Sequence, residues 1–400
     1  MPSELAAHWT LDPGVAFLNH GSFGATPRPV LEAQAEWRAR MEREPVAFFA
    51  RDLEPALDAA RGALGAFVGA DPDDLAFVTN ATTAMNIVAR SLRLAPGDEL
   101  VVLDHAYGAA RNIVATAAAQ AGARLVTAAV PFPAATPQGA RDALMAAVSD
   151  RTRLVLLDHV TSPTALVLPV AEIVADLAEC GVETLVDGAH APGMLDLDVD
   201  SIGAAYYAGN AHKWLFAPKG SAFLHVRRDR QDRVRPIVIS HGATSPRTDR
   251  SRFRLEHDWT GTLDPTPWLA VPAAIEFGAR LLPGGWDALR ARGHELALAA
   301  RDLLCTALDE PPPAPDSMIG AMAAIPLPPT AGEAPAMSTY DDPVHAALLG
   351  ARLQVAVGAW PQRPDGSPWR RLLRVSAAPY VDRADLERLA AAVGTLHAAA

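Results

Sequence analysis

Residues 183 to 214 read ETLVDGAHAPGMLDLDVDSIGAAYYAGNAHKW, and the prediction of the fold starts from this stretch. A short apolar run, Glu183–Val186, ends at Asp187, and a second run, Ala204–Tyr207, comes shortly before Lys213. Continuous apolar runs of this kind are typical of strands that are buried on both faces of a parallel sheet. An aspartate at the end of a buried strand needs a cation or a hydrogen-bond donor beside it, because burial removes its hydration.

Lysine is rare in this chain. Lys213 and Lys219 are its only lysines, although lysine and arginine together number 35. Lysine can lose its proton and act as a nucleophile, whereas arginine stays protonated. An amine that forms an imine and a carboxylate that keeps a pyridine nitrogen protonated are what pyridoxal phosphate requires from a protein. We therefore predict that Lys213 and Asp187 serve this cofactor, and that Lys219, in a turn-like segment, faces solvent.

The chain between residues 75 and 226 alternates apolar runs with amphipathic stretches, which indicates an α/β fold with a mostly parallel seven-stranded sheet covered by helices. The predicted strands are Leu75–Thr79, Glu99–Leu103, Arg124–Val130, Arg153–Asp158, Glu183–Val186, Ala204–Tyr207 and Ser221–Val226. The predicted helices include Ala81–Leu92, Arg111–Ala121 and Val170–Cys180. Ligands of such folds bind at the carboxyl ends of the strands. The polar residues that closely follow these strands are Thr82, Tyr107, Ser162 and Asp187.

The pattern changes beyond Trp268. A helical region to about Leu308, a strand at Met318–Leu327, a helix near His345–Leu353, a strand at Leu372–Ser376 and a last helix predict a smaller α+β domain. The predicted division is an N-terminal segment, 1–20, that packs with the small domain, a large domain, 21–268, and the small domain, 269–400. The stretch Thr330–Asp342 is predicted to be a mobile surface loop.

The composition excludes several classes of function. The net charge of −11 argues against nonspecific binding to nucleic acid or to an anionic membrane. The N-terminus lacks the basic and apolar segments of a signal peptide, and no apolar run is long enough to span a bilayer. Cys180 and Cys305 give neither a disulfide framework nor a metal-ligand spacing, and Cys180 is expected to be buried. We predict a cytoplasmic protein with no metal.

Further polar residues each have a functional and a structural interpretation. Thr82 and Thr83 stand where a strand gives way to a helix, and helix N-termini favour phosphate, but hydroxyl caps also open many helices for stability alone. Arg374 lies within an apolar strand, which suggests a bidentate partner such as an α-carboxylate. Six further residues could contact a cofactor, or they could have only a structural role in turns and in covering the core. They are Tyr107, His190, Asn210, His212, Gly261 and Thr262.

Taken together, these segments resemble the class V aminotransferase family of fold-type I pyridoxal phosphate enzymes, and within it the isopenicillin N epimerase-like group. The resemblance covers nearly the whole chain. It is carried by four segments, Leu18-Asn19-His20-Gly21-Ser22-Phe23-Gly24, Asp187-Gly188-Ala189-His190-Ala191-Pro192-Gly193, Ala208-Gly209-Asn210-Ala211-His212-Lys213-Trp214 and the stretch from Met318 to Pro328.

The resemblance implies a role for each of these residues. Lys213 would form the imine, Asp187 would partner the pyridine nitrogen, and His190 would lie near the phenolic oxygen. Tyr107 would stack on the ring, with Ser162 nearby. Arg374 would hold the substrate carboxylate, and Asn19, His20 and Ser22 belong to the predicted substrate-binding set. The residues implied around the phosphate are Thr82, Thr83, Asn210 and His212, with Gly261 and Thr262 reaching it from the neighbouring subunit of a homodimer.

The resemblance leaves several reactions open. Cysteine desulfurases of this family need a mobile cysteine in the C-terminal domain, and the segment from Pro328 to Arg371 contains none. Our first hypothesis is therefore an amino-acid epimerase or racemase, with Lys213 as the base and Tyr107 or a water as the donor on the opposite face. The alternatives are a β-eliminating C–S lyase, an aminotransferase and, last, a scaffold that binds the cofactor without catalysis.

Overall fold

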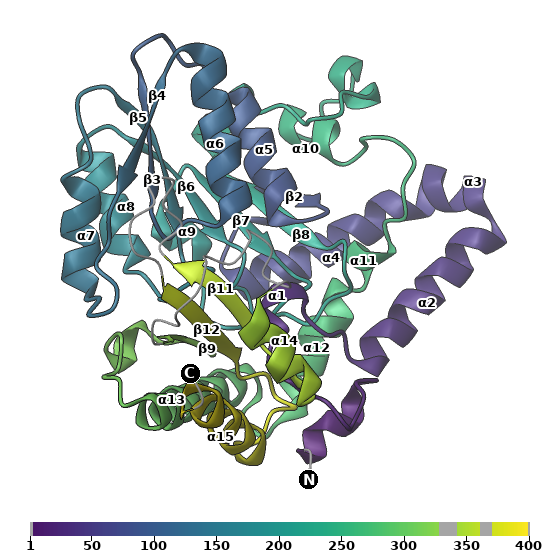
Figure 1. Ribbon diagram of the computed structural model, residues 1–400. Coiled ribbons are helices and arrows are strands. Elements are labelled where there is room, and N and C mark those ends of the chain that lie inside the picture. The colour runs from purple at the N-terminus through teal and green to yellow at the C-terminus, as the bar shows by residue number, and fades with distance from the viewer. Residues whose placement is uncertain (1–2, 328–341, 361–369, 399–400) are drawn as a thin grey trace.

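The computed structural model describes residues 3–327, 342–360 and 370–398. Its large sheet has seven strands in the order β2 (Leu75–Val78), β8 (Ala222–Val226), β7 (Tyr206–Asn210), β6 (Glu183–Gly188), β5 (Thr152–Asp158), β3 (Glu99–Leu103) and β4 (Arg124–Ala128) (Figure 1). β8 runs antiparallel to β2 and β7, and all other neighbouring strands are parallel. The predicted sheet is confirmed, although β7 begins and ends later than the predicted run Ala204–Tyr207.

Helices cover the sheet on both faces. Leu154 and Leu156 of β5 pack in one apolar cluster with residues of α5 (Ala81–Ser91) and α6 (Gly108–Ala121). Val155 and Leu157 point the other way, into the larger cluster that includes residues of α8 (Val170–Glu179). Because side chains alternate along a strand, the last residues of β5, β6 and β7 that face α5 and α6 are Asp158, Asp187 and Asn210.

The C-terminal part contains a three-stranded antiparallel sheet in the order β11 (Ala356–Trp360), β12 (Arg370–Ser376) and β9 (Met322–Pro326). It packs with α13 (Gly285–Leu308) and α15 (Arg383–Ala398), while α12 (Val271–Leu281) precedes them and α14 (Pro343–Gly350) precedes β10 (Leu353–Gln354). The α+β character is as predicted, but β10 and β11 were not predicted. The loop prediction for Thr330–Asp342 falls on residues outside the described part, apart from Asp342 at the start of α14.

The N-terminal segment joins this C-terminal part. β1 (Ala16–Phe17) pairs in parallel with β10, and the backbone N–H of Ser376 donates to the carbonyl of Leu18. The chain then enters α1 (His20–Phe23), α2 (Arg28–Arg43), α3 (Pro45–Ala47) and α4 (Leu53–Val68), none of which was predicted. The domain boundaries near residues 20 and 268 stay predictions.

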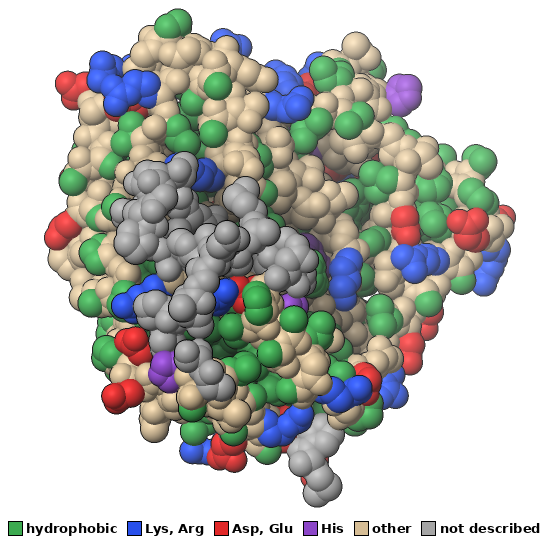
Figure 2. All heavy atoms as spheres, viewed as in Figure 1, with side chains coloured by type: hydrophobic (Ala, Val, Ile, Leu, Met, Phe, Trp, Pro, Cys, Tyr) green, Lys and Arg blue, Asp and Glu red, His purple; other side chains and the backbone are tan. Residues whose placement is uncertain are grey.

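Figure 1 shows α2 and α3 projecting from the body of the molecule. Hydrophobic side chains lie on the surface over this arm (Figure 2), and Val46 of α3 is 83% exposed. Cys180, predicted to be buried, is instead exposed, because it caps the C-terminus of α8 beyond the last packed turn. Among the described helices, none combines the length and hydropathy needed to cross a membrane.

Candidate active site

The site lies where the parallel strands end against the N-termini of two helices. The Asn210 amide oxygen, at the end of β7, accepts a hydrogen bond of 2.8 Å from the backbone N–H of Ala81, the first residue of α5. The Asp158 carboxylate, at the end of β5, accepts one from the backbone N–H of Tyr107, the residue that precedes α6. Asp187 lies between them, since β6 is flanked by β5 and β7. This edge therefore brings buried polar groups to a helix N-terminus, where anions bind readily.

Lys213 follows β7 and reaches into the same region. Its Nζ lies 3.4 Å from Nε2 of His190. The pKa of Lys213 is lowered to about 7, chiefly by burial and also by the positive charge of Arg374, while the Asp187 charge acts in the opposite direction. A large fraction of this amine is consequently unprotonated near neutral pH, the state in which lysine is nucleophilic or basic.

Asp187 is buried, and its Oδ1 accepts a hydrogen bond of 3.0 Å from the N–H of Ala189. Burial raises the pKa of Asp187, whereas the Ala189 N–H and the Lys213 charge lower it. A carboxylate in this position gains from a further cation beside it, because the desolvation that raises its pKa is then offset.

Asp158 was not among the predicted site residues. It pairs in register with Asp187 on the neighbouring strand, faces the same helices and is equally buried. Burial and the charge of Asp187 raise its pKa well above the usual range, so Asp158 is the member of the pair that keeps a proton. Its Oδ2 has no hydrogen-bond partner within the described residues. The sequence carried the same signal for Asp158 as for Asp187, an aspartate at the end of an apolar run.

Two histidines flank Lys213, and both are neutral. Burial lowers the pKa of His190 well below its usual value, with the charges of Lys213 and Arg374 adding to this effect, and its Nδ1 finds no partner among the described residues. Burial lowers the pKa of His212 to about 4, and the His212 Nδ1–H donates to the carbonyl of Ser221 at 3.0 Å. His190 is thus available to a bound group, whereas one nitrogen of His212 is already in use.

The predicted phosphate residues lie at the start of α5. Asn80 caps this helix by accepting from the Thr83 N–H at 2.8 Å, and the Thr83 hydroxyl is 2.9 Å from that of Thr79. Thr82, in the first turn, is half-buried. The cap of α5 is thus the Asn80 side chain and not the Thr82 or Thr83 hydroxyl, and a phosphate role for the two threonines stays a prediction at a well-formed helix N-terminus.

Arg374 of β12 gathers three of the other predicted residues. Its Nη1 donates to the Ser162 carbonyl at 2.6 Å and to the Ser162 hydroxyl at 3.3 Å. Its Nη2 donates to Ser22 Oγ at 3.0 Å and to Asn19 Oδ1 at 3.3 Å. The guanidinium is thereby fixed between the N-terminal segment, the loop after β5 and the C-terminal sheet, and its charge lowers the pKa of Lys213.

His20 differs from the expectation that it contacts substrate. Its exposed fraction is 0%, and both of its ring nitrogens are bonded, to the Tyr380 hydroxyl at 2.7 Å and to the Lys213 carbonyl at 3.0 Å. A fully buried ring whose two nitrogens are both hydrogen-bonded has no free polar atom for a ligand. The structure therefore places His20 against the backbone of Lys213 and not beside a substrate.

Tyr107, Gly261 and Thr262 lie more openly. Tyr107 is 47% exposed although its backbone bonds Asp158. Gly261 has a φ of +115° in a bend where an added Cβ would meet nothing within 4 Å, and Thr262 beside it is exposed. Within the described residues, no hydrogen bond joins Gly261 or Thr262 to the site of the same chain, which is consistent with a loop that contacts a different subunit.

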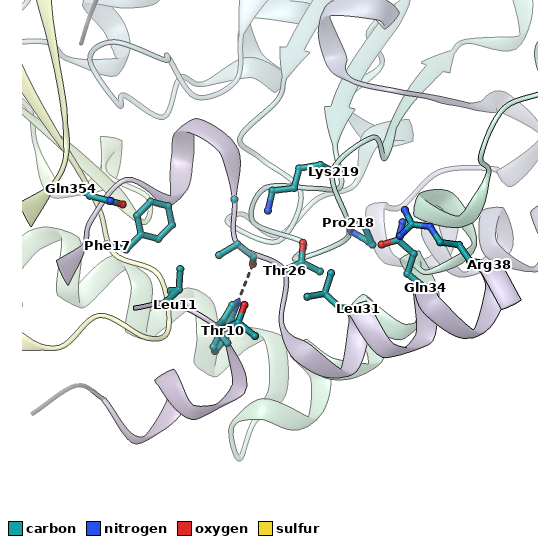
Figure 3. Close-up of a pocket in the computed structure, with 13 residues that line it drawn as sticks. Thr10, Leu11, Phe17, Thr26, Leu31, Gln34, Arg38, Pro218, Lys219 and Gln354 are labelled. Atoms are coloured by element: carbon teal, nitrogen blue, oxygen red, sulfur yellow. Dashed lines mark hydrogen bonds between the residues drawn. The ribbon is translucent and has the colours of Figure 1, made fainter. Parts of the chain in front are cut away.

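The second lysine occupies a different place. Lys219 lines a pocket of about 460 Å³ together with Trp9, Phe17, Thr26 and Arg38, and its side chain points into that pocket (Figure 3). Lys219 is exposed, as predicted for a turn residue, and partial burial lowers its pKa. Among the described residues, no group of three or more His, Cys, Asp or Glu side chains is placed to hold a metal ion.

Comparison with known proteins decides the family. The sequence model for aminotransferase class V matches residues 22–307, which include Asp187, His190 and Lys213. The chain belongs to the class V aminotransferase family. This membership confirms the predicted family, the enzyme class and the cofactor, pyridoxal phosphate.

Relatives within the class V family differ in their chemistry. The chain is 40% identical to isopenicillin N epimerase of Amycolatopsis lactamdurans over 97% of this chain and 96% of that protein. It is 34% identical to L-cysteine desulfhydrase of Arabidopsis thaliana over 78% of this chain and 70% of that protein. The structure of a cysteine desulfurase from Thermococcus onnurineus matches 99% of this chain and 98% of that chain with a TM-score of 0.80 at 18% identity, which confirms the fold.

The residues present fit the cofactor of the class V family. Two buried polar atoms, Asp158 Oδ2 and His190 Nδ1, lack partners within the described chain, and both lie at the edge where β5 and β6 end. Buried polar atoms are normally hydrogen-bonded, so such atoms indicate a place for a polar ligand. The amine of Lys213 beside them supplies the nucleophile that an aldehyde requires.

Proposed function

We propose that this protein is a pyridoxal phosphate-dependent amino-acid epimerase or racemase, acting at Cα of a substrate like that of isopenicillin N epimerase. The observation that carries the proposal is a buried Lys213 amine whose pKa is influenced by the charges of both Arg374 and Asp187, in a chain that is 40% identical to that epimerase over nearly its whole length. The bound cofactor withdraws electrons from Cα and makes its proton acidic. The protein then has to hold the substrate and move one proton on each face.

Each side chain has a proposed task in that reaction. The Arg374 guanidinium, oriented by Asn19, Ser22 and Ser162, binds the α-carboxylate, since a planar guanidinium matches a carboxylate. The Lys213 amine, with its pKa near neutrality, removes and returns the Cα proton on one face. Tyr107 supplies or receives the proton on the other face.

The remaining residues would hold the cofactor. Asp187 would keep the ring nitrogen protonated, and the neutral His190 would hydrogen-bond the phenolic oxygen through the nitrogen that has no partner in the described structure. Within the same chain, the proposed phosphate contacts come from the first turn of α5 and from the residues before Lys213, namely Thr82, Thr83, Asn210 and His212. Gly261 and Thr262 would be contributed by a partner subunit.

The second candidate is a β-eliminating C–S lyase, because the chain is also 34% identical to an L-cysteine desulfhydrase. It ranks below the epimerase, whose relative is more similar and covers more of the chain. Both reactions begin with removal of the Cα proton, so the residues proposed above serve either one. An aminotransferase is third, and a non-catalytic scaffold is the least favoured, since the amine and both of its charged neighbours are in place.

The decisive experiment follows the proton at Cα. Amino acids incubated with the holoenzyme in deuterated water should gain deuterium at Cα and change configuration, without release of pyruvate, sulfide or keto acid. Tyr107→Phe should slow racemisation roughly a hundredfold, the usual contribution of a general acid, and slow exchange on the Lys213 face much less. Equal loss of both would assign Tyr107 to ring stacking, and release of pyruvate or sulfide would establish the lyase instead.

We also propose a homodimer with shared sites. The proposal draws on exposed apolar side chains in the α1–α3 region and on a loop after β8, which an interface would bury. They are Phe23, Leu31, Val46, Ile237, Val238 and Ile239. The exposed bend at Gly261 and Thr262 is free to enter a neighbouring site. The cytoplasmic location stays a prediction from the sequence.

Mixing two inactive variants tests the shared site. Lys213→Ala subunits and Thr262→Asp subunits should each be nearly inactive, the second because a new carboxylate repels the phosphate. After mixing and exchange of subunits, roughly a quarter of the wild-type activity should return, because about half of the dimers are hybrids with one intact site each. A protein that is monomeric and fully active in solution would refute the proposal.

A further inference from the structure

A buried hydrogen-bonded chain runs from the C-terminal part to the backbone of Lys213. The Tyr380 hydroxyl lies 2.7 Å from Nδ1 of His20, and Nε2 of His20 lies 3.0 Å from the Lys213 carbonyl oxygen. Both rings are buried, and the His20 ring also packs against that of Trp214, the residue after Lys213, at 4.8 Å between centroids.

The direction of every hydrogen bond in this chain is determined. Burial lowers the pKa of His20 to about 3, so its ring is neutral and carries a single N–H. The Lys213 carbonyl can only accept, which puts the hydrogen on Nε2 and makes Nδ1 the acceptor. The Tyr380 hydroxyl must then donate to Nδ1, and burial raises the pKa of Tyr380 well above its usual value, so that this proton stays in place.

The segment that carries His20 contacts its neighbours on two sides. Gly24 has a φ of +70°, and a Cβ on it would lie 2.0 Å from the His212 carbonyl oxygen. On the opposite side, the Gly21 N–H donates to Ser376 Oγ at 3.0 Å. The segment therefore lies between the loop that carries Lys213 and the end of β12, and it contacts both.

We propose that His20 and Tyr380 are positioning residues that set where the Lys213 amine stands relative to Arg374. Arg374 lies on β12, and Tyr380 follows the same strand by a short connection. Arg374, which would bind the substrate carboxylate, is therefore linked to the backbone of Lys213, which would move the Cα proton. The link runs from β12 through Tyr380 and His20. This inference rests on the proposed function for the identity of the reaction, but the position of the Lys213 amine does not depend on which reaction the protein catalyses.

The experiment compares Tyr380→Phe with a matched control, Tyr206→Phe. Tyr206 is also buried and its hydroxyl donates one hydrogen bond, to Glu183 Oε2 at 3.1 Å, on the strand β7 but away from Lys213. In Tyr380→Phe, kcat for Cα exchange should fall roughly tenfold to a hundredfold with a smaller change in KM, because small displacements of a reacting group cost this much. Tyr206→Phe should retain wild-type kcat.

A second readout needs no reaction with an amino acid. Competitive acetylation of the apoprotein across a pH series reports the pKa of the Lys213 amine, and Lys219 in the same chain serves as the internal reference. Tyr380→Phe and His20→Leu should move the apparent pKa of Lys213 upward, toward that of an exposed lysine, while His20→Gln, which keeps one donor and one acceptor, should restore most of the wild-type value.

The outcomes separate the two proposals. If Tyr380→Phe matches Tyr206→Phe in both kcat and Lys213 pKa, and changes only the melting temperature, the chain of hydrogen bonds is structural and the inference is wrong. If the Lys213 pKa shifts as expected while the wild-type protein fails to racemise any amino acid, the positioning role stands and the proposed reaction fails. Should His20→Leu not fold, the Tyr380→Phe result alone decides.

Discussion

Lys213→Ala is expected to abolish exchange of the Cα proton, with a loss of at least about a thousandfold, because one side chain acts both as the nucleophile for the cofactor and as the base. Borohydride treatment of the wild-type holoenzyme should fix the cofactor to Lys213 alone, as shown by mass spectrometry of the peptides. The chain supplies its own control, because Lys219, the only other lysine, lines a separate pocket. Lys219→Ala should keep wild-type exchange, and a cofactor found on Lys219 would overturn the assignment.

The pH dependence gives the same experiment a second check. The pKa of Lys213 is about 7, so the rate at which the apoprotein captures the cofactor should rise as the pH increases through neutrality and then level off. The positive charge of Arg374 helps to lower this pKa by disfavouring the ammonium form. Arg374→Gln should therefore move the profile to higher pH. A rate that continues to rise far above neutral pH would show that an amine with an ordinary lysine pKa captures the cofactor instead.

The sheet could be predicted from the sequence because its strands are buried on both faces. Such strands must be apolar throughout, as in Leu100–Leu103 or Leu154–Leu157, and this requirement is visible without knowing the partners. The arm from α2 to α3 could not be predicted in the same way. Most of its side chains are exposed, so burial imposes little apolar pattern on Arg28–Arg43.

The site could be predicted only in part, because some roles depend on contacts between distant segments. Arg374 within an apolar strand already suggested a partner, and the structure brings it to Ser162 and Ser22. His20 belonged to a motif near the predicted site, but whether its ring faces substrate or the back of Lys213 depends on Tyr380, 360 residues away. Nothing in the local sequence distinguishes these two orientations.

Asp158 shows the opposite case, a residue whose local signal was present and was not used. Both Asp158 and Asp187 end buried strands, and the structure places them in register on the same face of the sheet. Two carboxylates so close cannot both stay charged in a buried site, so their environments must assign them different protonation states. The charge of Lys213 lowers the pKa of Asp187, whereas Asp158 accepts a hydrogen bond from the backbone N–H of Tyr107.

This difference predicts losses of turnover of very different size for the same substitution at the two positions. Asp187→Asn should lower turnover roughly a hundredfold to a thousandfold, since it removes the charge that stabilises a protonated ring nitrogen. Asp158→Asn should cost less than about tenfold, because an amide replaces a carboxylic acid that is already neutral, with nearly the same shape and with an oxygen that still accepts from the Tyr107 N–H.

The measurements are kcat for Cα exchange, the visible absorption of the bound cofactor and the melting temperature of each apoprotein. Asp187→Asn should change the first two and leave the fold intact, because removing a buried charge also removes its desolvation cost. Infrared difference spectra add a direct test, since the band of a protonated carboxyl should disappear in Asp158→Asn and persist in Asp187→Asn. Near-native turnover in Asp187→Asn together with severe loss in Asp158→Asn would exchange the two roles and make Asp158 the partner of the ring nitrogen.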